Sequence, residues 1–168
     1  MAFPGPPLWL ALYEPDIAQN AGAMLRTCAC FGVAAAIIEP AGFPVSDRHF
    51  RRAGMDYLDH VIIDRHVSWR AFSQWRRADA RRLVLLTTKA EETLWDFAFR
   101  YGDVIMVGRE SAGVPQDVHD EADARVRIAM RPAMRCLNVS VAAGVALAEA
   151  MRQIAPAATA LASIAEMG

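Results

Sequence analysis

Hydrophobic residues along this chain fall into short, dense runs separated by stretches of mixed polarity. Runs of consecutive apolar residues are typical of strands that are covered on both faces, and six of them occur, at 8–12, 34–38, 61–63, 83–86, 104–107 and 126–128. Apolar residues recur at helical spacing in the longer segments 21–31, 67–80 and 139–153, and Gly32 provides a C-terminal cap for the first. Because strands and helices alternate, we predict an α/β fold with a mainly parallel sheet flanked by helices.

The length of 168 residues predicts one domain, which we place at 8–153. Residues 1–7 are rich in proline and glycine and are expected to be flexible, and 154–168 reads as an alanine-rich tail. No apolar run approaches the roughly 20 residues that span a membrane, and no basic segment precedes the apolar stretch near the start. We therefore expect a cytoplasmic protein with no membrane partner.

The formal net charge of −1 means that only local clusters of cations could favour a nucleic-acid partner. Two arginine clusters exist, and each by itself reads as a solvated surface: Arg48, Arg51 and Arg52, and Arg76, Arg77, Arg81 and Arg82. The odd set of cysteines lacks a Cys-x-x-Cys pair, so we expect reduced thiols. The four histidines lack metal-ligand spacing, and no metal is expected.

Two loops carry the candidate chemistry. In the first, Asn138 and Ser140 read as capping residues before a helix of small residues. In the second, the glycine-bounded segment 108–113 follows the strand predicted at 104–107. Neither a Gly-x-Gly-x-x-Gly turn nor a phosphate-binding loop ending in Gly-Lys-Ser/Thr is present, so an ordinary nucleotide-binding domain is excluded. Two such loops in one small domain suggest one shared pocket.

Three further polar residues are ambiguous when each is taken alone. Taken alone, Asn20 is more often a helix N-cap and Arg26 more often part of a surface ion pair, whereas Glu110 could equally be a loop carboxylate that holds backbone amides.

Their combination resembles a known family. Asn-x-Gly-x-x-x-Arg at 20–26, Gly-x-Glu-x-x-Gly at 108–113 and Leu-Asn-Val-Ser at 137–140 resemble, in order, the three motifs of the SPOUT methyltransferases. The segments 38–43, 51–57 and 86–89 look specifically like the small tRNA (cytidine/uridine-34-2'-O)-methyltransferase group, the TrmL or YibK-like enzymes. The resemblance covers residues 8–153.

Members of that family have an α/β fold with a C-terminal deep trefoil knot, which binds S-adenosylmethionine. The resemblance alone implies the knot, because knots are so rare that physical reasoning from the sequence would exclude one. Carried over to this chain, the resemblance implies that the cofactor is bound by Leu86, Thr87, Gly108, Glu110, Gly113, Ile128, Cys136, Leu137 and Asn138. Glycines would let the backbone approach the cofactor while leucine and isoleucine pack on its base.

The implied reaction is methyl transfer to the ribose 2'-hydroxyl of wobble nucleotide 34 in a tRNA anticodon loop. Arg26 and Asn20 would be the catalytic residues. Because an arginine pKa above about 12 makes a poor base, we interpret Arg26 as positioning the hydroxyl and a phosphate, with deprotonation only if it is strongly perturbed. Glu110 would organise its loop. The family works as homodimers with the RNA site across the interface, and the resemblance points to tRNA contacts by Arg51, Arg52, Arg135 and Ser140.

Three positions depart from the usual family pattern. Cys136 stands where serine is common, Ala112 where a larger polar residue is common, and Ala148 where some members have an aromatic residue. The departures at Ala112 and Ala148 put tRNA affinity or nucleotide preference in question. Two alternatives therefore stay open: methylation of another tRNA or rRNA position, and a knotted RNA-binding protein without catalysis.

Overall fold

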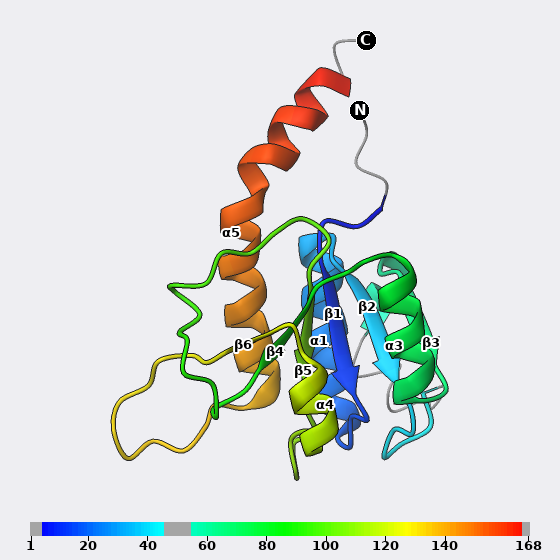
Figure 1. The fold of residues 1–168 in the computed structure, drawn as a ribbon. Helices are drawn as coiled ribbons and strands as arrows, with labels where there is room; N and C mark the ends of the chain where they lie inside the picture. Colours follow the sequence, from blue (N-terminus) through cyan, green and yellow to red (C-terminus); the bar gives the residue numbers. More distant parts are fainter. Residues whose placement is uncertain (1–4, 46–54, 166–168) are drawn as a thin grey trace.

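A single parallel sheet forms the centre of the molecule (Figure 1). The computed structural model describes residues 5–45 and 55–165. The strands lie in the order β3-β2-β1-β5-β4-β6, and every pair of neighbours is parallel. Their bounds are β1 Trp9–Tyr13, β2 Ala34–Ile38, β3 Ile63–His66, β4 Leu83–Leu86, β5 Val104–Val107 and β6 Ala124–Val126. The α/β class and the parallel sheet predicted from the sequence are confirmed.

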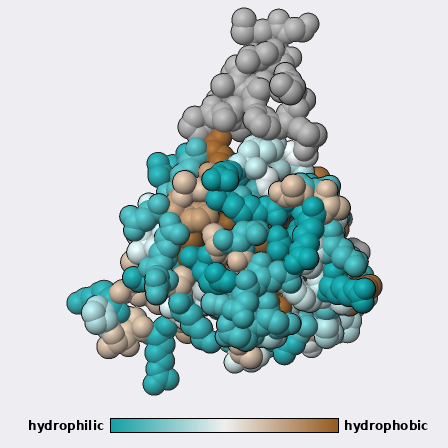
Figure 2. All heavy atoms as spheres, in the orientation of Figure 1, coloured by the Kyte–Doolittle hydropathy of each residue, from teal (hydrophilic) through white to brown (hydrophobic). Residues whose placement is uncertain are grey.

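Helices cover both faces of the sheet, which explains why its central strands are continuously apolar. Helices α1 (Ala18–Phe31) and α5 (Val139–Ala165) pack on one face through side chains such as Met24 and Leu147. Helices α3 (Trp69–Ala78) and α4 (Gln116–Glu121) pack on the other through Phe72 and Val118. All residues of β1, β2 and β5 are buried. Hydrophilic residues dominate the face seen in Figure 2, with an apolar patch below the grey segment.

The predicted elements match the observed ones best at the centre of the sheet. Three strands have the predicted bounds, at 34–38, 83–86 and 104–107. The edge strand β3 lies at Ile63–His66 instead of 61–63, because a half-buried edge tolerates Asp64 and Arg65, and β6 starts at Ala124 instead of 126. The sequence did not predict the 3-10 helix η1 (Met55–His60) or α4, since both are too short to show a repeat of apolar residues at helical spacing.

Two helices differ in length from the prediction. Helix α1 begins at Ala18 instead of residue 21, after Ile17, which makes no side-chain capping bond. It ends as predicted at Gly32, whose φ of 66° is the left-handed conformation that glycine adopts freely. Helix α5 continues from Val139 to Ala165, beyond the predicted end at 153, and so runs through most of the segment expected to be a tail.

Two surface expectations can be compared with the structure, and the one for Arg76 is wrong. The carbonyls of Gly5 and Pro7, in the segment expected to be flexible, accept hydrogen bonds from Tyr101 Oη at 2.7 Å and from Gly102 N at 2.8 Å. Arg76, assigned to a solvated cluster, is buried because its guanidinium pairs with Asp123 Oδ2 at 2.9 Å and with Glu121. Among the described residues, no helix is long and apolar enough to cross a membrane.

Candidate functional site

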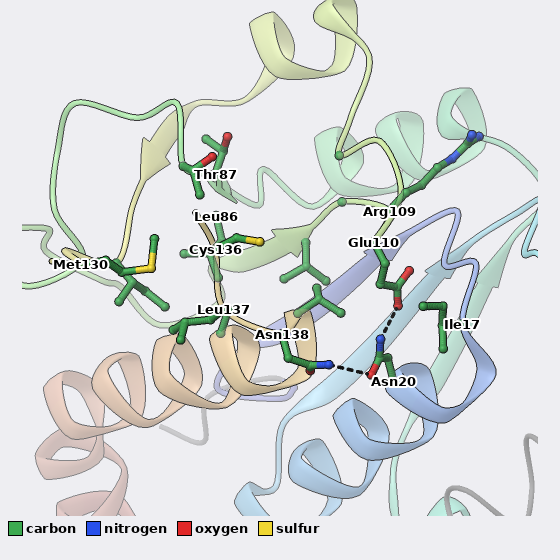
Figure 3. A pocket seen from close by; sticks show the side chains of 17 residues that line it. Ile17, Asn20, Leu86, Thr87, Arg109, Glu110, Met130, Cys136, Leu137 and Asn138 are labelled. Atoms are coloured by element: carbon green, nitrogen blue, oxygen red, sulfur yellow. Dashed lines mark hydrogen bonds between the residues drawn. The ribbon is translucent and has the colours of Figure 1, made fainter. Parts of the chain in front are cut away.

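A cavity of about 440 Å³ opens where the carboxyl ends of β4 and β5 meet the N-terminal ends of α1 and α5. Such a volume lies within the range of small-molecule sites, and the carboxyl edge of a parallel sheet is where α/β proteins usually place them. The segment between β6 and α5 closes one side, with Met130 and Leu137 on its wall (Figure 3).

The structure brings all nine predicted cofactor residues to this cavity. They line it together with Asn20: Leu86, Thr87, Gly108, Glu110, Gly113, Ile128, Cys136, Leu137 and Asn138. Sequence reasoning did not select the remaining lining residues, namely Ile17, Thr88, Val107, Arg109, Met130, Val139 and Ala142. Most of these seven flank a predicted residue directly in the chain, so adjacency to the motifs would have found them.

Hydrogen bonds join the three sequence motifs across the cavity. Asn20 Nδ2 donates to Glu110 Oε1 at 3.3 Å, and Asn138 Nδ2 donates to Asn20 Oδ1 at 3.2 Å (Figure 3). Asn20 therefore occupies the middle of a line that runs from the β5–α4 loop to the start of α5. Asn20 lies inside α1, which begins at Ala18, so its amide is used for these contacts and does not cap the helix.

Asn138 caps α5, as the sequence predicted. Its Oδ1 accepts from Ser140 N at 2.9 Å and from Val141 N at 3.4 Å, which satisfies two amides of the first turn. Ser140, the other predicted cap, lies inside the helix, and its hydroxyl donates to the same Asn138 oxygen at 2.5 Å. One asparagine thus fixes the helix start and faces Asn20.

The loop 108–113 is closed tightly by its two glycines. Arg109 and Gly113 exchange backbone hydrogen bonds of 3.0 and 2.9 Å, and Gly113 has a φ of 65°. A Cβ on Gly108 would lie 2.6 Å from the Gly113 carbonyl carbon, so that no larger residue fits without moving the backbone. The two glycines of the second motif therefore set the shape of the loop that carries Glu110.

Charge is sparse around the cavity, since only Arg109 and Glu110 among its lining residues are charged. Arg109 forms an ion pair with Glu14. Burial raises the pKa of the Glu110 carboxyl, and its hydrogen bond with Asp16 raises it further. The opposite holds for Asp16, where hydrogen bonding to Glu110 lowers the pKa to about 2.

The walls and the free backbone groups suit a planar heteroaromatic base. Leu86, Ile128 and Leu137 give an apolar surface, which such a base requires. Within the described part of the chain, the backbone amides and carbonyls of Cys136 and Leu137 make no hydrogen bond, so they are available to a ligand. An adenosine-bearing cofactor therefore fits the residues that are present.

Several predicted residues lie away from the cavity. Arg26 is exposed on a different face of α1, where its guanidinium stacks 4.7 Å from the centre of the Tyr57 ring. Arg135 is exposed in the segment before α5, and Ser140 is not a lining residue. Arg51 and Arg52 lie outside the described residues.

The three departures from the family pattern have different positions. The Cys136 side chain points into the cavity (Figure 3), whereas Ala112 and Ala148 are both exposed and neither lines it. Cysteines 28, 30 and 136 are all free thiols, as expected. Within the ranges 5–45 and 55–165 we find no group of three side chains suited to holding a metal ion.

Comparison with known proteins gives consistent results. The sequence matches the SpoU rRNA Methylase family over residues 7–148. A tRNA (cytidine(34)-2'-O)-methyltransferase from Beijerinckia indica is 66% identical over 145 residues, which cover 86% of this chain and 91% of that protein.

Solved structures agree with the sequence matches. A structure concerning the 2-OH methylation of C/U34 on tRNA is similar with a TM-score of 0.85 at 38% identity, covering 89% of this chain and 97% of that one. An AdoMet-bound rRNA methyltransferase from Sinorhizobium meliloti is similar with a TM-score of 0.81 at 25% identity, covering 91% of this chain and 59% of that one. These neighbours confirm the predicted fold class, the α/β knot of the SPOUT type.

Proposed function

Since this chain belongs to the SpoU rRNA Methylase family, we propose that it methylates the ribose 2'-hydroxyl of nucleotide 34, a cytidine or modified uridine, in tRNA anticodon loops. The contacts between the three motifs support this function in addition to family membership. The three motifs are far apart in sequence, yet hydrogen bonds through Glu110, Asn20 and Asn138 join them on one cavity. A relative that is 66% identical over 145 residues is a tRNA (cytidine(34)-2'-O)-methyltransferase.

The cofactor of this proposal is S-adenosylmethionine, whose sulfonium supplies an activated methyl group when it is bound. Leu86, Ile128 and Leu137 would pack on the adenine, while the backbone of Cys136 and Leu137 would hydrogen-bond its edge and the ribose. Gly108 and Gly113 let the loop backbone come close to the ligand. An AdoMet-bound neighbour of the same fold supports this assignment.

The catalytic task of the protein is to align a ribose hydroxyl with the methyl group, since alignment supplies much of the rate in such substitutions. We assign this to Asn20 and Arg26. Asn20 faces the cavity, where Glu110 and Asn138 fix both ends of its amide. Arg26 would bind the hydroxyl and the neighbouring phosphate, because guanidinium stays protonated and forms strong hydrogen bonds to phosphate oxygens.

Arg26 stacks on Tyr57 and does not line the cavity of its own chain. A homodimer would account for this distance between Arg26 and the cavity. An RNA site built across the interface would use Arg26 from one copy beside the cavity of the other. Helices α1 and α5 support a second copy, since Ile17 just before α1, Phe31 in α1 and Val141 in α5 are large apolar side chains that remain exposed.

The tRNA is expected to contact the rim of the cavity. Arg135 is exposed, and in the described ranges it has no ion pair, so its guanidinium is available for a phosphate. We keep Arg51, Arg52 and Ser140 as further candidate tRNA contacts. A tRNA substrate also leads us to place the protein in the cytoplasm.

Mass spectrometry of tRNA from a strain that lacks the endogenous enzyme tests the proposal. Incubation with the protein and S-adenosylmethionine should add one 2'-O-methyl group at nucleotide 34, and Arg26→Ala should abolish it while cofactor binding persists. Methylation mapped to another nucleotide would establish the other-position alternative instead. Cofactor-independent tRNA binding without any methylation would overturn the enzyme assignment.

A further inference from the structure

The loop before α1 lies against the loop that carries Glu110, and two acidic side chains connect them. Glu14 forms an ion pair with Arg109. Two residues later, Asp16 Oδ1 accepts a hydrogen bond from Glu110 N at 3.1 Å, and its Oδ2 accepts one from the Ser111 hydroxyl. The two carboxylates thus hold three consecutive residues of the β5–α4 loop, although 94 or more positions separate Asp16 from its partners.

The contact between Asp16 and Glu110 is reciprocal. Asp16 N donates to Glu110 Oε2 at 3.3 Å, which leaves Oε1 to accept from Asn20 Nδ2 at 3.3 Å. With both oxygens engaged, the Glu110 carboxylate has one orientation. Asn20 is then oriented with its carbonyl oxygen toward Asn138 Nδ2 at 3.2 Å. Asp16 does not line the cavity, yet the contacts that run from Asp16 through Glu110 and Asn20 end at the cap of α5.

The backbone behind Asp16 prevents it from moving away. Gly42 N donates to Pro15 O at 2.8 Å, and a Cβ on Gly42 would lie 2.9 Å from Asp16 Cα. Glu14 has a φ of 40°, a left-handed conformation that is unfavourable for a residue with a side chain. Its amide donates to Ile38 O at 2.9 Å, and its carboxylate pairs with Arg109. The surroundings therefore hold both carboxylates in place.

The two carboxyl groups of the contact have pKa values that shift in opposite directions. Hydrogen bonding to Glu110 lowers the pKa of Asp16 to about 2, so Asp16 is ionised throughout the neutral range. Burial, followed by the bond to Asp16, raises the pKa of Glu110. Hydrogen bonds to an ionised acceptor are stronger than bonds between neutral groups, which makes Asp16 the fixed anchor of the pair.

We propose that Asp16, with Glu14 beside it, is the positioning residue of the candidate cofactor site. The two carboxylates form a clamp that holds the Gly108–Gly113 loop so that Glu110 orients Asn20 and Asn138. This proposal rests on the proposed function, because it assigns the clamp to the same pocket. Asp16 would act through Glu110 and Asn20, so it need not contact the cofactor or the tRNA.

Equilibrium binding of S-adenosylmethionine to the whole protein tests the clamp without any transfer step. Asp16→Ala should weaken binding about tenfold, because two charge-assisted hydrogen bonds are lost. Asp16→Asn retains one neutral oxygen acceptor for Glu110 N and should recover part of that loss. Asp79→Asn, which removes an exposed carboxylate at the end of α3, is the matched control and should bind normally. Normal binding by Asp16→Ala, or no recovery in Asp16→Asn, would overturn the clamp.

A double-mutant cycle separates positioning from a merely structural role. If Asp16 acts through Glu110, then Asp16→Ala should cause no further loss of cofactor affinity in a Glu110→Ala background. Additive losses would contradict the proposal. Ser111→Ala removes only the hydrogen bond that the Ser111 hydroxyl donates to Asp16, and it should weaken cofactor binding two- to threefold. This variant tests the clamp if Asp16→Ala folds poorly.

Amide hydrogen exchange of residues 108–113 gives a readout that does not depend on the ligand. Exchange at Glu110 should be faster in Asp16→Ala than in Asp79→Asn, and equal protection would overturn the clamp. The two proposals fail separately. A wild-type protein that binds S-adenosylmethionine but leaves nucleotide 34 unmodified disproves the proposed function, whereas normal binding and exchange in Asp16→Ala disprove the clamp alone.

Discussion

At the scale of single residues, the centre of the candidate site is the side-chain amide of Asn20, which bonds to Glu110 and to Asn138 across the cavity. The resemblance selected Asn20, Glu110 and Asn138, and all three line one cavity. The amide of Asn20 is used between Glu110 and Asn138, which no inspection of helix-capping preference would show. Asp16 passed unnoticed because its partners lie 94 and 95 positions away, and an isolated aspartate before a helix carries no signal of such a contact.

The buried thiol of Cys28 leads to a prediction about alkaline stability. Burial raises its pKa from 9.0 to about 12 in the folded protein. The folded state thus keeps a proton that the unfolded state loses above pH 9, so the free energy of unfolding falls as pH rises from about 9 toward 12. The slope from this one group is about 1.4 kcal/mol per pH unit.

Denaturant unfolding between pH 8 and 10.5 measures this effect. Cys28→Ala should flatten the dependence on pH, although it lowers stability overall by opening a cavity. Cys30→Ala, which changes an exposed thiol, should retain the wild-type slope. Identical slopes in all three proteins would contradict the assignment to Cys28.

Asn138 permits a second prediction, because its two side-chain atoms have separate tasks. Its Oδ1 caps α5, and its Nδ2 donates to Asn20. Asn138→Asp keeps a good capping acceptor but loses the donor, so stability should be retained while methyl transfer falls at least tenfold. Asn138→Ala should lose both, with a decrease of about 1 kcal/mol in the free energy of unfolding. Thermal unfolding and initial rates measured in parallel decide between these outcomes.

At the scale of elements, most residues of the candidate site lie in loops, and the strands hold these loops in position. The buried strands were predicted with correct bounds at 34–38, 83–86 and 104–107, because each is a continuous apolar run. Short polar elements escaped prediction: α4 (Gln116–Glu121) has a single buried residue, Val118. Helix α5 extends beyond its predicted end because its alanine-rich continuation favours a helix even without the apolar period used to place it.

The tight turn of the loop 108–113 supports a third prediction. Gly108→Ala places a Cβ 2.6 Å from the backbone of Gly113, so the loop must shift away from its present path. S-adenosylmethionine affinity should fall more than tenfold, while the cooperative thermal transition remains. Ala112→Ser adds one atom to an exposed position of the same loop and should bind the cofactor normally. Calorimetric titration of both variants checks the difference, and equal affinities would refute it.

At the scale of the whole molecule, the position of Arg26 fits the homodimer that we propose. Arg26 faces Tyr57 on a side of α1 that does not reach the cavity, whereas Asn20 on the same helix lines it. A helix directs residues six positions apart to different sides. In the proposed dimer, Arg26 of a second copy would lie beside the candidate cofactor cavity.

Mixed dimers test this arrangement. Arg26→Ala should be inactive alone, and Gly108→Ala should be inactive alone at a cofactor concentration that does not fill its weakened cavity. A dimer that contains one copy of each has one site with an intact cavity and an intact Arg26 from the other copy, so random pairing should restore activity to about a quarter of the sites. Mixed dimers isolated through two different affinity tags should therefore methylate tRNA. If such purified mixed dimers are inactive, Arg26 acts in its own chain.

The sequence by itself determined the alternation of strands and helices and the apolar core of the sheet, and its motifs indicated ten of the residues that line the cavity. Continuous apolar runs, apolar residues at helical spacing and motif residues are all properties of short stretches of the chain, so they can be recognised in the sequence. Only the tertiary structure decided which face of α1 holds Arg26, where α5 ends, and that Asp16 meets Glu110 and Ser111. These depend on contacts between segments about 100 positions apart or on the packing of whole helices, and no local pattern encodes them.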